Sequence, residues 1–476
     1  MCQNCTRRDF LGSAAMGGLL LATGRLAAGG QAAGSGARTA GKVKICAVFT
    51  GQPGVPGRGW TLNAPEIEAL KNRLADIEKK LGNVEFVVGQ AATPEQTAAL
   101  LAQAGEDAPV LAINLSITGL LKAIPPVLES GRPLAVYSEP ATGHDWMYPY
   151  RWQREGKPVT LMVSSDNREL ERAASLLRVI PLMRRSRVLI MPPMRGTEPS
   201  CTPKQVKQRL GTDAVAIDEA RFDELLDSAD AAQVEAETSK WLDEATRIIE
   251  PSREDVVKAV RVSLALNRLV DEEQADAVAI GTCMRWLPKG FPCLGFTRLR
   301  DRGIPASCEG DMDSLWTMLL FQHAIGQPGF QGNATFDTSR NALWTAHCVG
   351  PLKMDGPDGL AAPYLLRSHS EIGHGVVPEI QYRVGQKITR TKLINLDTLL
   401  ISTGTIVEVP ELSVRACRTQ IVTEIDDAAA MARNWGGGVL EGDMMTLLHR
   451  VVYYGDHVQS MRHLGDLMGF RVLKEA

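Results

Sequence analysis

The regular alternation of short apolar segments with longer amphipathic ones, beginning near residue 42, constrains the fold of this chain most strongly. Val43–Phe49 is mostly apolar, Ala64–Leu81 repeats Leu and Ile at helical spacing, and Val84–Val88 is mostly apolar again. The alternation continues through Pro133–Tyr137. Strands that alternate with helices pair in parallel, and helices then cover both faces of the sheet. The sequence therefore predicts a Rossmann-like α/β domain over residues 42–150.

A second alternating region follows, and the pattern changes after it. Strand-like segments at Arg187–Met191 and Ala277–Gly281 lie on either side of long helical stretches such as Arg253–Leu269. This region predicts a second α/β domain over residues 151–350. After about residue 350, short β-prone runs are separated by Gly, Pro and Asp, which predicts a small β-rich barrel or sandwich over residues 351–476.

The first forty residues have the composition of an export signal. Arg7-Arg8 is followed by Asp9-Phe10-Leu11, by a modest apolar stretch, and by Gly, Ala and Ser up to Ala40. This order resembles a twin-arginine signal, which exports proteins that have already folded. We expect residues 1–40 to be such a signal peptide and the protein to act in the periplasm or elsewhere outside the cytoplasm. The alternative is a disordered or helical tail.

The cysteines favour export after folding. Of the nine in the chain, Cys2 and Cys5 precede the paired arginines, and the other seven are scattered. An odd, scattered set does not form a disulfide framework. Thiols of a protein folded in the cytoplasm remain reduced and pack as small hydrophobic groups. We expect this packing role for five cysteines: Cys46, Cys293, Cys308, Cys348 and Cys417.

Charge and apolar content exclude two classes of partner. The chain has 52 basic and 55 acidic residues, a net charge of −3, and 5% aromatic residues. This balance gives no reason to expect a nucleic-acid partner. No uninterrupted apolar run approaches the ~20 residues of a membrane anchor. The loop Gly51–Gly59 matches no phosphate-binding motif, and its two prolines lack amide donors, so we expect a rim loop there.

Residues 292–352 carry most of the chemical information. Glu309 and Asp311 stand just before the predicted helix Asp313–Ile325, where a helix dipole favours carboxylates, so caps are one interpretation. Two predicted strands, 333–336 and 343–346, then lead to Asp337 and His347. Acids and a histidine at the ends of neighbouring strands can converge on a divalent cation, which is the other interpretation.

The motifs in this stretch resemble those of the L-fucose isomerase and L-arabinose isomerase superfamily. The resemblance lies in Cys-Glu-Gly-Asp at 308–311, in Phe-Asp after Gly-Asn-Ala-Thr at 332–337, and in His-Cys-x-Gly-Pro at 347–351. It implies a Mn²⁺ ion, or another divalent cation, bound by Glu309, Asp337 and His347. The run at 447–457 resembles the segment with the last metal-binding histidine, here His449.

The same resemblance implies the fold, the assembly and the reaction. The implied fold class is α/β, with two Rossmann-like, doubly wound parallel-sheet domains followed by a β-rich C-terminal barrel domain. The implied assembly is a homo-oligomer, a trimer or a hexamer, with active sites between subunits. The implied reaction interconverts an aldose and a ketose.

The chemistry of this reaction explains the residue types. Proton transfer between C1 and C2 of a sugar passes through a cis-enediol, and a hard cation stabilises its developing oxyanion. Two carboxylates can exchange the roles of acid and base, and we assign these roles to Glu309 and Asp337 without fixing their order. Two rival functions remain, an exported sugar-binding protein without catalysis and an epimerase on the same scaffold.

Three further side chains are candidates for contact with the small-molecule sugar. His369 lies on a glycine-flanked loop, where a solvated residue is the alternative. Trp435 precedes three glycines and could stack on a sugar or anchor the turn. His457 follows Gly455-Asp456 and could contact the substrate or a neighbouring subunit.

Overall fold

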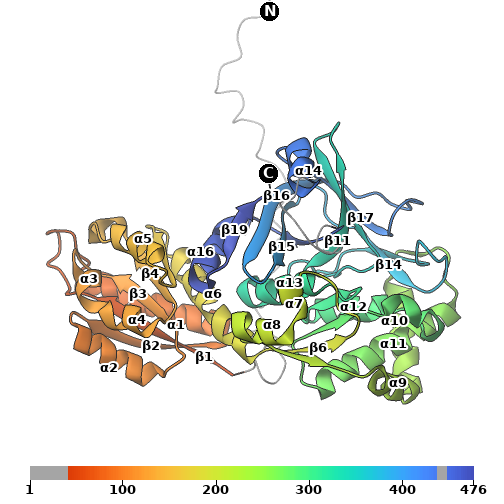
Figure 1. Ribbon diagram of the computed structural model, residues 1–476, viewed down its shortest axis with the longest axis horizontal. Coiled ribbons are helices and arrows are strands. Elements are labelled where there is room, and N and C mark those ends of the chain that lie inside the picture. The colour runs from red at the N-terminus through yellow and green to blue at the C-terminus, as the bar shows by residue number, and fades with distance from the viewer. Residues whose placement is uncertain (1–40, 437–447, 476) are drawn as a thin grey trace, which may run out of the picture. The chain divides into compact units, whose positions relative to one another are not determined.

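The computed structural model describes residues 41–436 and 448–475. The predicted signal, residues 1–40, lies outside the described residues. The first sheet is parallel, with strand order β2-β1-β3-β4-β5 (Figure 1). Its strands are β1 (Val43–Thr50), β2 (Val84–Ala91), β3 (Val110–Asn114), β4 (Leu134–Ser138) and β5 (Val159–Val163). Its helices are α1 (Ala64–Leu81), α2 (Pro94–Ala104), α3 (Gly119–Ala123), α4 (Pro125–Ser130), α5 (Met147–Arg154) and α6 (Arg168–Arg185).

Local sequence explains the first helix well. Asn63 caps α1 in a capping box with Glu66, and four apolar side chains of the helix are buried. The end of the first sheet differs from the expected boundary at residue 150. Strand β5 pairs with β4, so the sheet continues to Val163, and the expected boundary at residue 150 falls inside α5.

The second sheet is also parallel, with strand order β10-β9-β6-β7. Its strands are β6 (Arg187–Met191), β7 (Asp213–Ala216), β9 (Ala277–Ile280) and β10 (Ala306–Cys308). The helices of this region are α7 (Glu198–Cys201), α8 (Pro203–Leu210), α9 (Glu219–Asp227), α10 (Ala231–Glu244), α11 (Arg253–Glu272), α12 (Cys293–Asp301) and α13 (Met312–Ile325). In both sheets, the second strand of the sequence lies on one side of the first strand, and the later strands are added on its other side. This is the doubly wound order that places ligand sites at the carboxyl ends of the strands.

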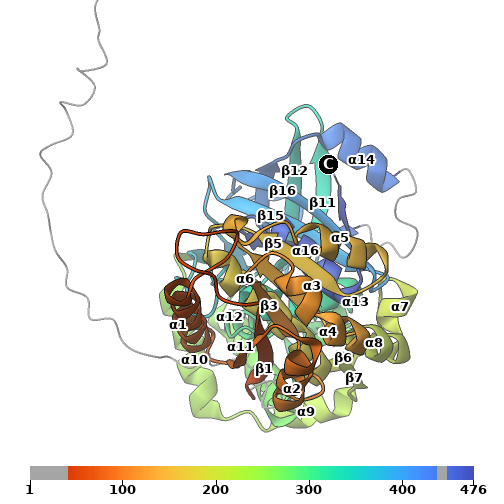
Figure 2. The same cartoon turned by 90° about the vertical axis from the view of Figure 1, so that its left-hand side faces the viewer.

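Six antiparallel strands close into a barrel, because β15 pairs with both β18 and β16. The barrel strands are β11 (Phe330–Asp337), β12 (Ala342–His347), β15 (Lys387–Ile394), β16 (Thr398–Glu408), β17 (Thr419–Glu424) and β18 (His449–Tyr454). Figure 2 shows four of them, β11, β12, β15 and β16, close together. The predicted combination of parallel α/β sheets with a β-barrel is therefore confirmed. The barrel begins at Phe330, inside the segment expected to belong to the second α/β domain.

The remaining strands lie outside the barrel wall. Strand β19 (Arg471–Lys474) adds to β16 in parallel, and β8 (Arg247–Ile248), β13 (Tyr364–Arg367) and β14 (Val377–Ile380) form a small sheet. The C-terminal part also contains α14 (Ala428–Gly436) and α16 (Val458–Met468). None of the described helices is long and apolar enough to cross a membrane.

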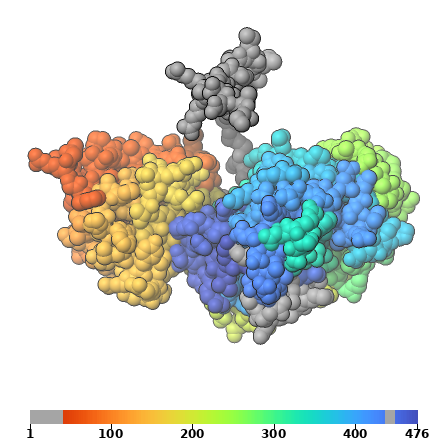
Figure 3. Space-filling model, turned by 90° about the horizontal axis from the view of Figure 1, so that it is seen from above, coloured from red at the N-terminus to blue at the C-terminus, as the bar shows by residue number. Residues whose placement is uncertain are grey.

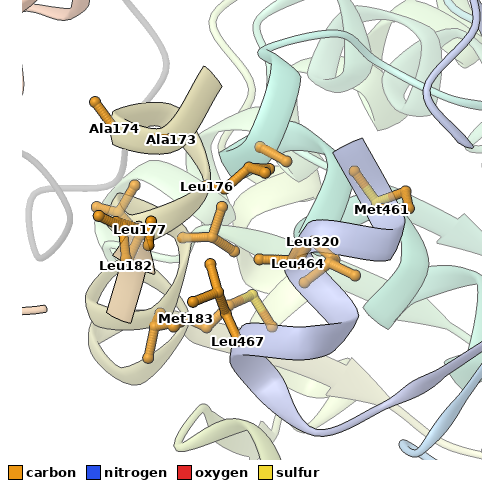
Figure 4. Packing of buried hydrophobic residues seen from close by; sticks show 14 of the residues in the cluster. Ala173, Ala174, Leu176, Leu177, Leu182, Met183, Leu320, Met461, Leu464 and Leu467 are labelled. Carbon is orange, nitrogen blue, oxygen red and sulfur yellow. The ribbon is translucent and has the colours of Figure 1, made fainter. Parts of the chain in front are cut away.

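Helix α13 joins the second sheet to the barrel. It is apolar on all sides and packs against β9, β10, β15 and β18. Figure 4 shows where it meets α6 and α16, with Leu176, Leu320 and Leu464 in one buried cluster. Each such side chain contributes about 2 kcal/mol when fully buried. In the space-filling view the blue C-terminal helix lies against the yellow part of the chain that contains α6 and β5 (Figure 3).

Candidate metal centre

Glu309, His347 and His449 come together from three separate elements. Glu309 directly follows β10, His347 ends β12, and His449 begins β18. One potential ligand atom from each of these residues lies within 4.8 Å of the others. The second parallel sheet and the barrel thus each supply ligands to one point, and α13 keeps the two in contact.

The backbone around Glu309 is unusual and tightly packed. Glu309 has a φ of 58°, a left-handed conformation that costs a residue with a side chain roughly 1–2 kcal/mol. A Cβ on the next residue, Gly310, would lie 2.2 Å from the carbonyl oxygen of Pro193, and one on Gly281 would lie 1.9 Å from it. The loops after β6, β9 and β10 therefore meet without intervening side chains. This close packing fixes Glu309 at the carboxyl edge of the second sheet.

The histidine nitrogens have the chemistry of metal ligands. Both histidines are buried: His347 is 3% exposed and His449 is 0% exposed. Neither ring nitrogen of His347, nor Nε2 of His449, has a hydrogen-bond partner among the described residues. Burial, reinforced by the neighbouring His449, lowers the pKa of His347 well below its ordinary value and keeps the ring neutral. A buried polar atom without a partner costs about 1–3 kcal/mol, and a cation would satisfy Nε2 of His449 and one ring nitrogen of His347.

A buried carboxylate orients His449. Asp311 Oδ2 lies 3.0 Å from His449 Nδ1 and 2.9 Å from Lys392 Nζ. Burial alone would raise the pKa of Asp311, but the charge of Lys392 and the contact with His449 hold it below its usual range. The ionised carboxylate can only accept, so Nδ1 carries the proton and donates to it. The lone pair of His449 is then on Nε2, 3.5 Å from Glu309 Oε2. Asp311 is also the N-cap of α13, so the cap interpretation holds alongside this second role.

A small cavity of about 30 Å³ is lined by two of the three residues, Glu309 and His347. Besides Glu309 and His347, its wall includes Asn333, His369, Glu371 and five cysteines. His369 stacks on Phe291 with ring centroids 5.0 Å apart. The side chain of Glu309 is 30% exposed and Glu371 is exposed, so solvent reaches the centre from their side.

Asp337 does not join the centre, which corrects the expectation for this residue. It ends β11 four residues beyond Asn333, which is about 13 Å further along the strand at ~3.3 Å per residue. Its Oδ1 accepts hydrogen bonds from Ser339 N at 3.2 Å and Ser339 Oγ at 2.6 Å, as expected for a turn-capping aspartate. The residue of this strand that lines the cavity is Asn333, whose amide oxygen has no partner among the described residues.

The structure also separates the three candidate substrate residues. Of these, His369 alone lines the cavity. Trp435 packs against Phe336, and the guanidinium of Arg450 lies 3.8 Å from its ring centroid. Nε2 of His457 lies 2.7 Å from the carbonyl oxygen of Tyr454. Neither Trp435 nor His457 is among the residues that line the cavity, and the contacts of Trp435 agree with the packing role that the sequence left open for it.

Sequence reasoning missed three participants. Asn333 lies in the predicted strand 333–336, and this short sequence does not indicate which side chains of the strand face the candidate ligands. Glu371 lies two residues after His369, in a loop that the sequence marked as a candidate pocket wall. Lys392 lies in a strand that also contains Lys387 and Arg390, so the sequence gives no sign that this lysine is the buried partner of a carboxylate.

No family model matches the chain, and no curated protein matches it. The chemical interpretation of the centre therefore rests on its own geometry and on the motif resemblance described above.

Proposed function

We propose that this protein is a divalent-cation-dependent aldose–ketose isomerase that acts on a free sugar or sugar derivative. The observation that supports the proposal is the convergence of Glu309, His347 and His449, which place one potential ligand atom each within 4.8 Å of the others, with ring nitrogens that have no hydrogen-bond partner among the residues described. Carboxylate and imidazole suit Mn²⁺, and they also suit Fe²⁺ and Zn²⁺. We keep Mn²⁺ as the first candidate because the motif resemblance implies it.

We assign metal binding, orientation of a ligand and proton transfer to different residues. Glu309, His347 and His449 would hold the ion, and Asp311 fixes the ring of His449. When bound, the ion polarises a carbonyl group and neutralises the charge that develops on its oxygen. Proton transfer needs a carboxylate near the substrate, and with Asp337 outside the centre this role passes to Glu371, the other acid of the cavity wall.

The size of the cavity determines how a sugar would approach. A volume of about 30 Å³ has room for water-sized groups and is far too small for a hexose. The reacting end of an open-chain sugar would therefore enter from the exposed side formed by Glu309 and Glu371, with the rest of the molecule outside. In a homo-oligomer a second copy could cover that part. If residues 1–40 direct export, the reaction takes place outside the cytoplasm.

Isotope exchange tests this function. The protein is incubated with Mn²⁺ and a panel of aldoses in D₂O, and the ketose formed and the aldose recovered are analysed for deuterium at C1 and C2. Ketose with deuterium at C1 supports isomerisation, exchange at C2 of the aldose without ketose supports the epimerase, and binding without exchange supports a sugar-binding protein. Glu371→Gln should abolish exchange and leave Mn²⁺ affinity unchanged. Asp337→Asn, the matched control, should retain both.

A further inference from the structure

Five of the seven described cysteines line the cavity beside the candidate metal centre: Cys283, Cys293, Cys308, Cys348 and Cys417. All five are buried and reduced. Four of them form two pairs. The sulfurs of Cys283 and Cys308 lie 3.5 Å apart, and Cys348 is hydrogen-bonded to Cys417. Each pair contains the sequence neighbour of a candidate ligand, because Cys308 precedes Glu309 and Cys348 follows His347.

The pair Cys283–Cys308 is coupled directly to the metal centre. Cys308 ends β10, and Cys283 begins the short helix η2 (Cys283–Lys289) after the neighbouring strand β9. The sulfur of Cys283 accepts a hydrogen bond from the backbone N–H of Glu309 as well as contacting Cys308. A disulfide has an S–S distance of about 2.05 Å, so closing the bond draws the two sulfurs together by about 1.5 Å. The sulfur of Cys283, which accepts the hydrogen bond from the Glu309 amide, then shifts.

We propose that Cys283 and Cys308 form a dithiol that hydrogen peroxide oxidises to a disulfide, and that this disulfide weakens metal binding at Glu309, His347 and His449. One thiol sulfur attacks the peroxide, the O–O bond breaks, and water leaves with formation of a sulfenic acid. The second sulfur attacks this sulfenic sulfur, the S–O bond breaks, and a second water leaves. The two thiols lose two electrons in total, and one peroxide is reduced to two waters.

The cavity selects a small oxidant. The exposures of Cys283 and Cys308 are 3% and 6%, and the adjoining space of about 30 Å³ is of the order of a water molecule. Hydrogen peroxide is only slightly larger than water, whereas oxidised glutathione is a bulky peptide disulfide. We therefore expect peroxide to oxidise the pair in the folded protein and oxidised glutathione to leave it reduced.

The effect on the metal centre follows from the position of Glu309. Metal ligands must be held within about 0.5 Å of their working geometry. Glu309 is in a left-handed conformation beside Gly310, which packs on Pro193, so the loop has no freedom to absorb the shift of Cys283, and Glu309 is displaced from that geometry. We expect oxidation to lower the Mn²⁺ affinity at least tenfold, and reduction to restore it.

The test uses the whole chain, purified under reducing conditions and freed of metal. It is treated with hydrogen peroxide or with oxidised glutathione, and its disulfides are mapped by peptide mass spectrometry. Mn²⁺ affinity is measured before oxidation, after it, and after reduction. Cys283→Ala and Cys308→Ala remove one partner each, and Cys46→Ala is the matched control because Cys46 is equally buried but lies in the first sheet. Thermal unfolding checks that each variant is folded.

We expect hydrogen peroxide, but not oxidised glutathione, to form a Cys283–Cys308 disulfide, and the oxidised sample to lose Mn²⁺ affinity. Cys46→Ala should show both effects. Cys283→Ala and Cys308→Ala should show neither. Free thiols after peroxide, a bond between Cys348 and Cys417 instead, equal reaction with glutathione disulfide, or unchanged affinity in the oxidised form would each overturn the inference.

This inference rests on the proposed metal centre, and the two can fail separately. If the reduced protein does not bind Mn²⁺, the proposed function fails. The disulfide map and the hydrogen exchange of residues 306–312 then decide the inference, because a disulfide that moves Glu309 changes the exchange of its amide. Unchanged exchange in the oxidised protein would overturn the coupling.

Discussion

The carboxylate of Asp311 and the imidazole of His449 lie 3.0 Å apart, although 138 positions separate them in the sequence. The same carboxylate oxygen lies 2.9 Å from Lys392 Nζ in β15. One side chain thus links the start of α13 with two barrel strands at the candidate metal centre. All three groups are fully buried, so the arrangement persists only while their charges and hydrogen bonds are matched.

Asp311→Asn should lower metal affinity without touching a ligand. The amide is neutral and no longer fixes the protonated Nδ1 of His449, so Nε2 loses its defined lone pair. Loss of such an outer contact typically costs 10–100-fold in metal affinity, and we expect a decrease of that size. Isothermal titration with Mn²⁺ measures it, and Asp337→Asn should give the affinity of the unmodified protein.

Stability needs its own control in this experiment. Asp311→Asn removes the buried carboxylate that lies 2.9 Å from Lys392 Nζ, which should cost about 3 kcal/mol in the free energy of unfolding. Replacing the lysine as well, in Asp311→Asn with Lys392→Met, should recover most of that loss and leave metal affinity low. Recovery of full affinity in the double variant would show that Asp311 does not orient His449.

His347→Leu should separate stability from metal binding. Both ring nitrogens of His347 are buried and have no hydrogen-bond partner in the described part of the chain, so removing them should leave the metal-free protein equally stable or up to about 1 kcal/mol more stable. A metal at one hundred times its dissociation constant should stabilise the unmodified protein by about 2.7 kcal/mol, and this gain should vanish in the variant. Urea unfolding with and without Mn²⁺ measures both. His457→Gln should retain the gain, because His457 is not among the cavity residues.

The parts of the fold that depend on local sequence could be predicted. Ala64–Leu81 begins and ends as expected, because its cap and its apolar spacing are both encoded within it. The partner of a strand is not local information. Val159–Val163 reads as a strand in either α/β unit, and only its pairing with β4 assigns it to the first sheet. Likewise β11 pairs with β18 across more than a hundred residues, which the sequence around Phe330 does not encode.

The candidate centre likewise contains residues whose positions local sequence indicates and one residue whose position depends on strand pairing. The structure brings together Glu309, His347 and His449 as the motifs suggested, because each is next to a strand end. Asp337 also lies at a strand end, but this end is at the turn of the β11–β12 hairpin, whereas the ligands lie at the opposite end of the hairpin. In the antiparallel register Asn333 lies opposite His449, while Asp337 pairs with Ala342 near the turn. Predicting this difference requires the length of β11, which began three residues earlier than expected.

Glu309→Gly should stabilise the metal-free protein and abolish metal binding. Glycine adopts the φ of 58° without strain, so we expect the free energy of unfolding to rise by about 1 kcal/mol. Leu412→Gly is the matched control, because Leu412 has a φ of 56° in a loop away from the centre. It should give a similar rise and leave Mn²⁺ affinity unchanged. Equal stability losses in both variants would contradict the assignment of strain.

Acid should destabilise the fold through His463. Its Nδ1 lies 2.7 Å from Thr160 Oγ1 and its Nε2 lies 3.0 Å from Gln459 Nε2, so the helix α16 is joined to β5 by a neutral imidazole. Burial, with a smaller effect of Arg172, lowers the pKa of His463 to about 4. In the unfolded chain the pKa is about 6.5. The unfolded state therefore binds more protons between these values, and stability must fall as the pH falls from 6.5 to 4.

A variant comparison isolates this contribution from that of other titrating groups. The free energy of unfolding is measured in urea at several pH values for the unmodified protein, for His463→Gln and for His144→Gln. The difference between the unmodified protein and His463→Gln should shrink on acidification, with a slope that approaches about 1.4 kcal/mol per pH unit inside the window. His144 is exposed, so its variant should follow the unmodified protein throughout. A pH-independent difference for His463→Gln would mean that the pKa of this histidine is the same in the folded and unfolded states, and so would contradict the effect of burial on it.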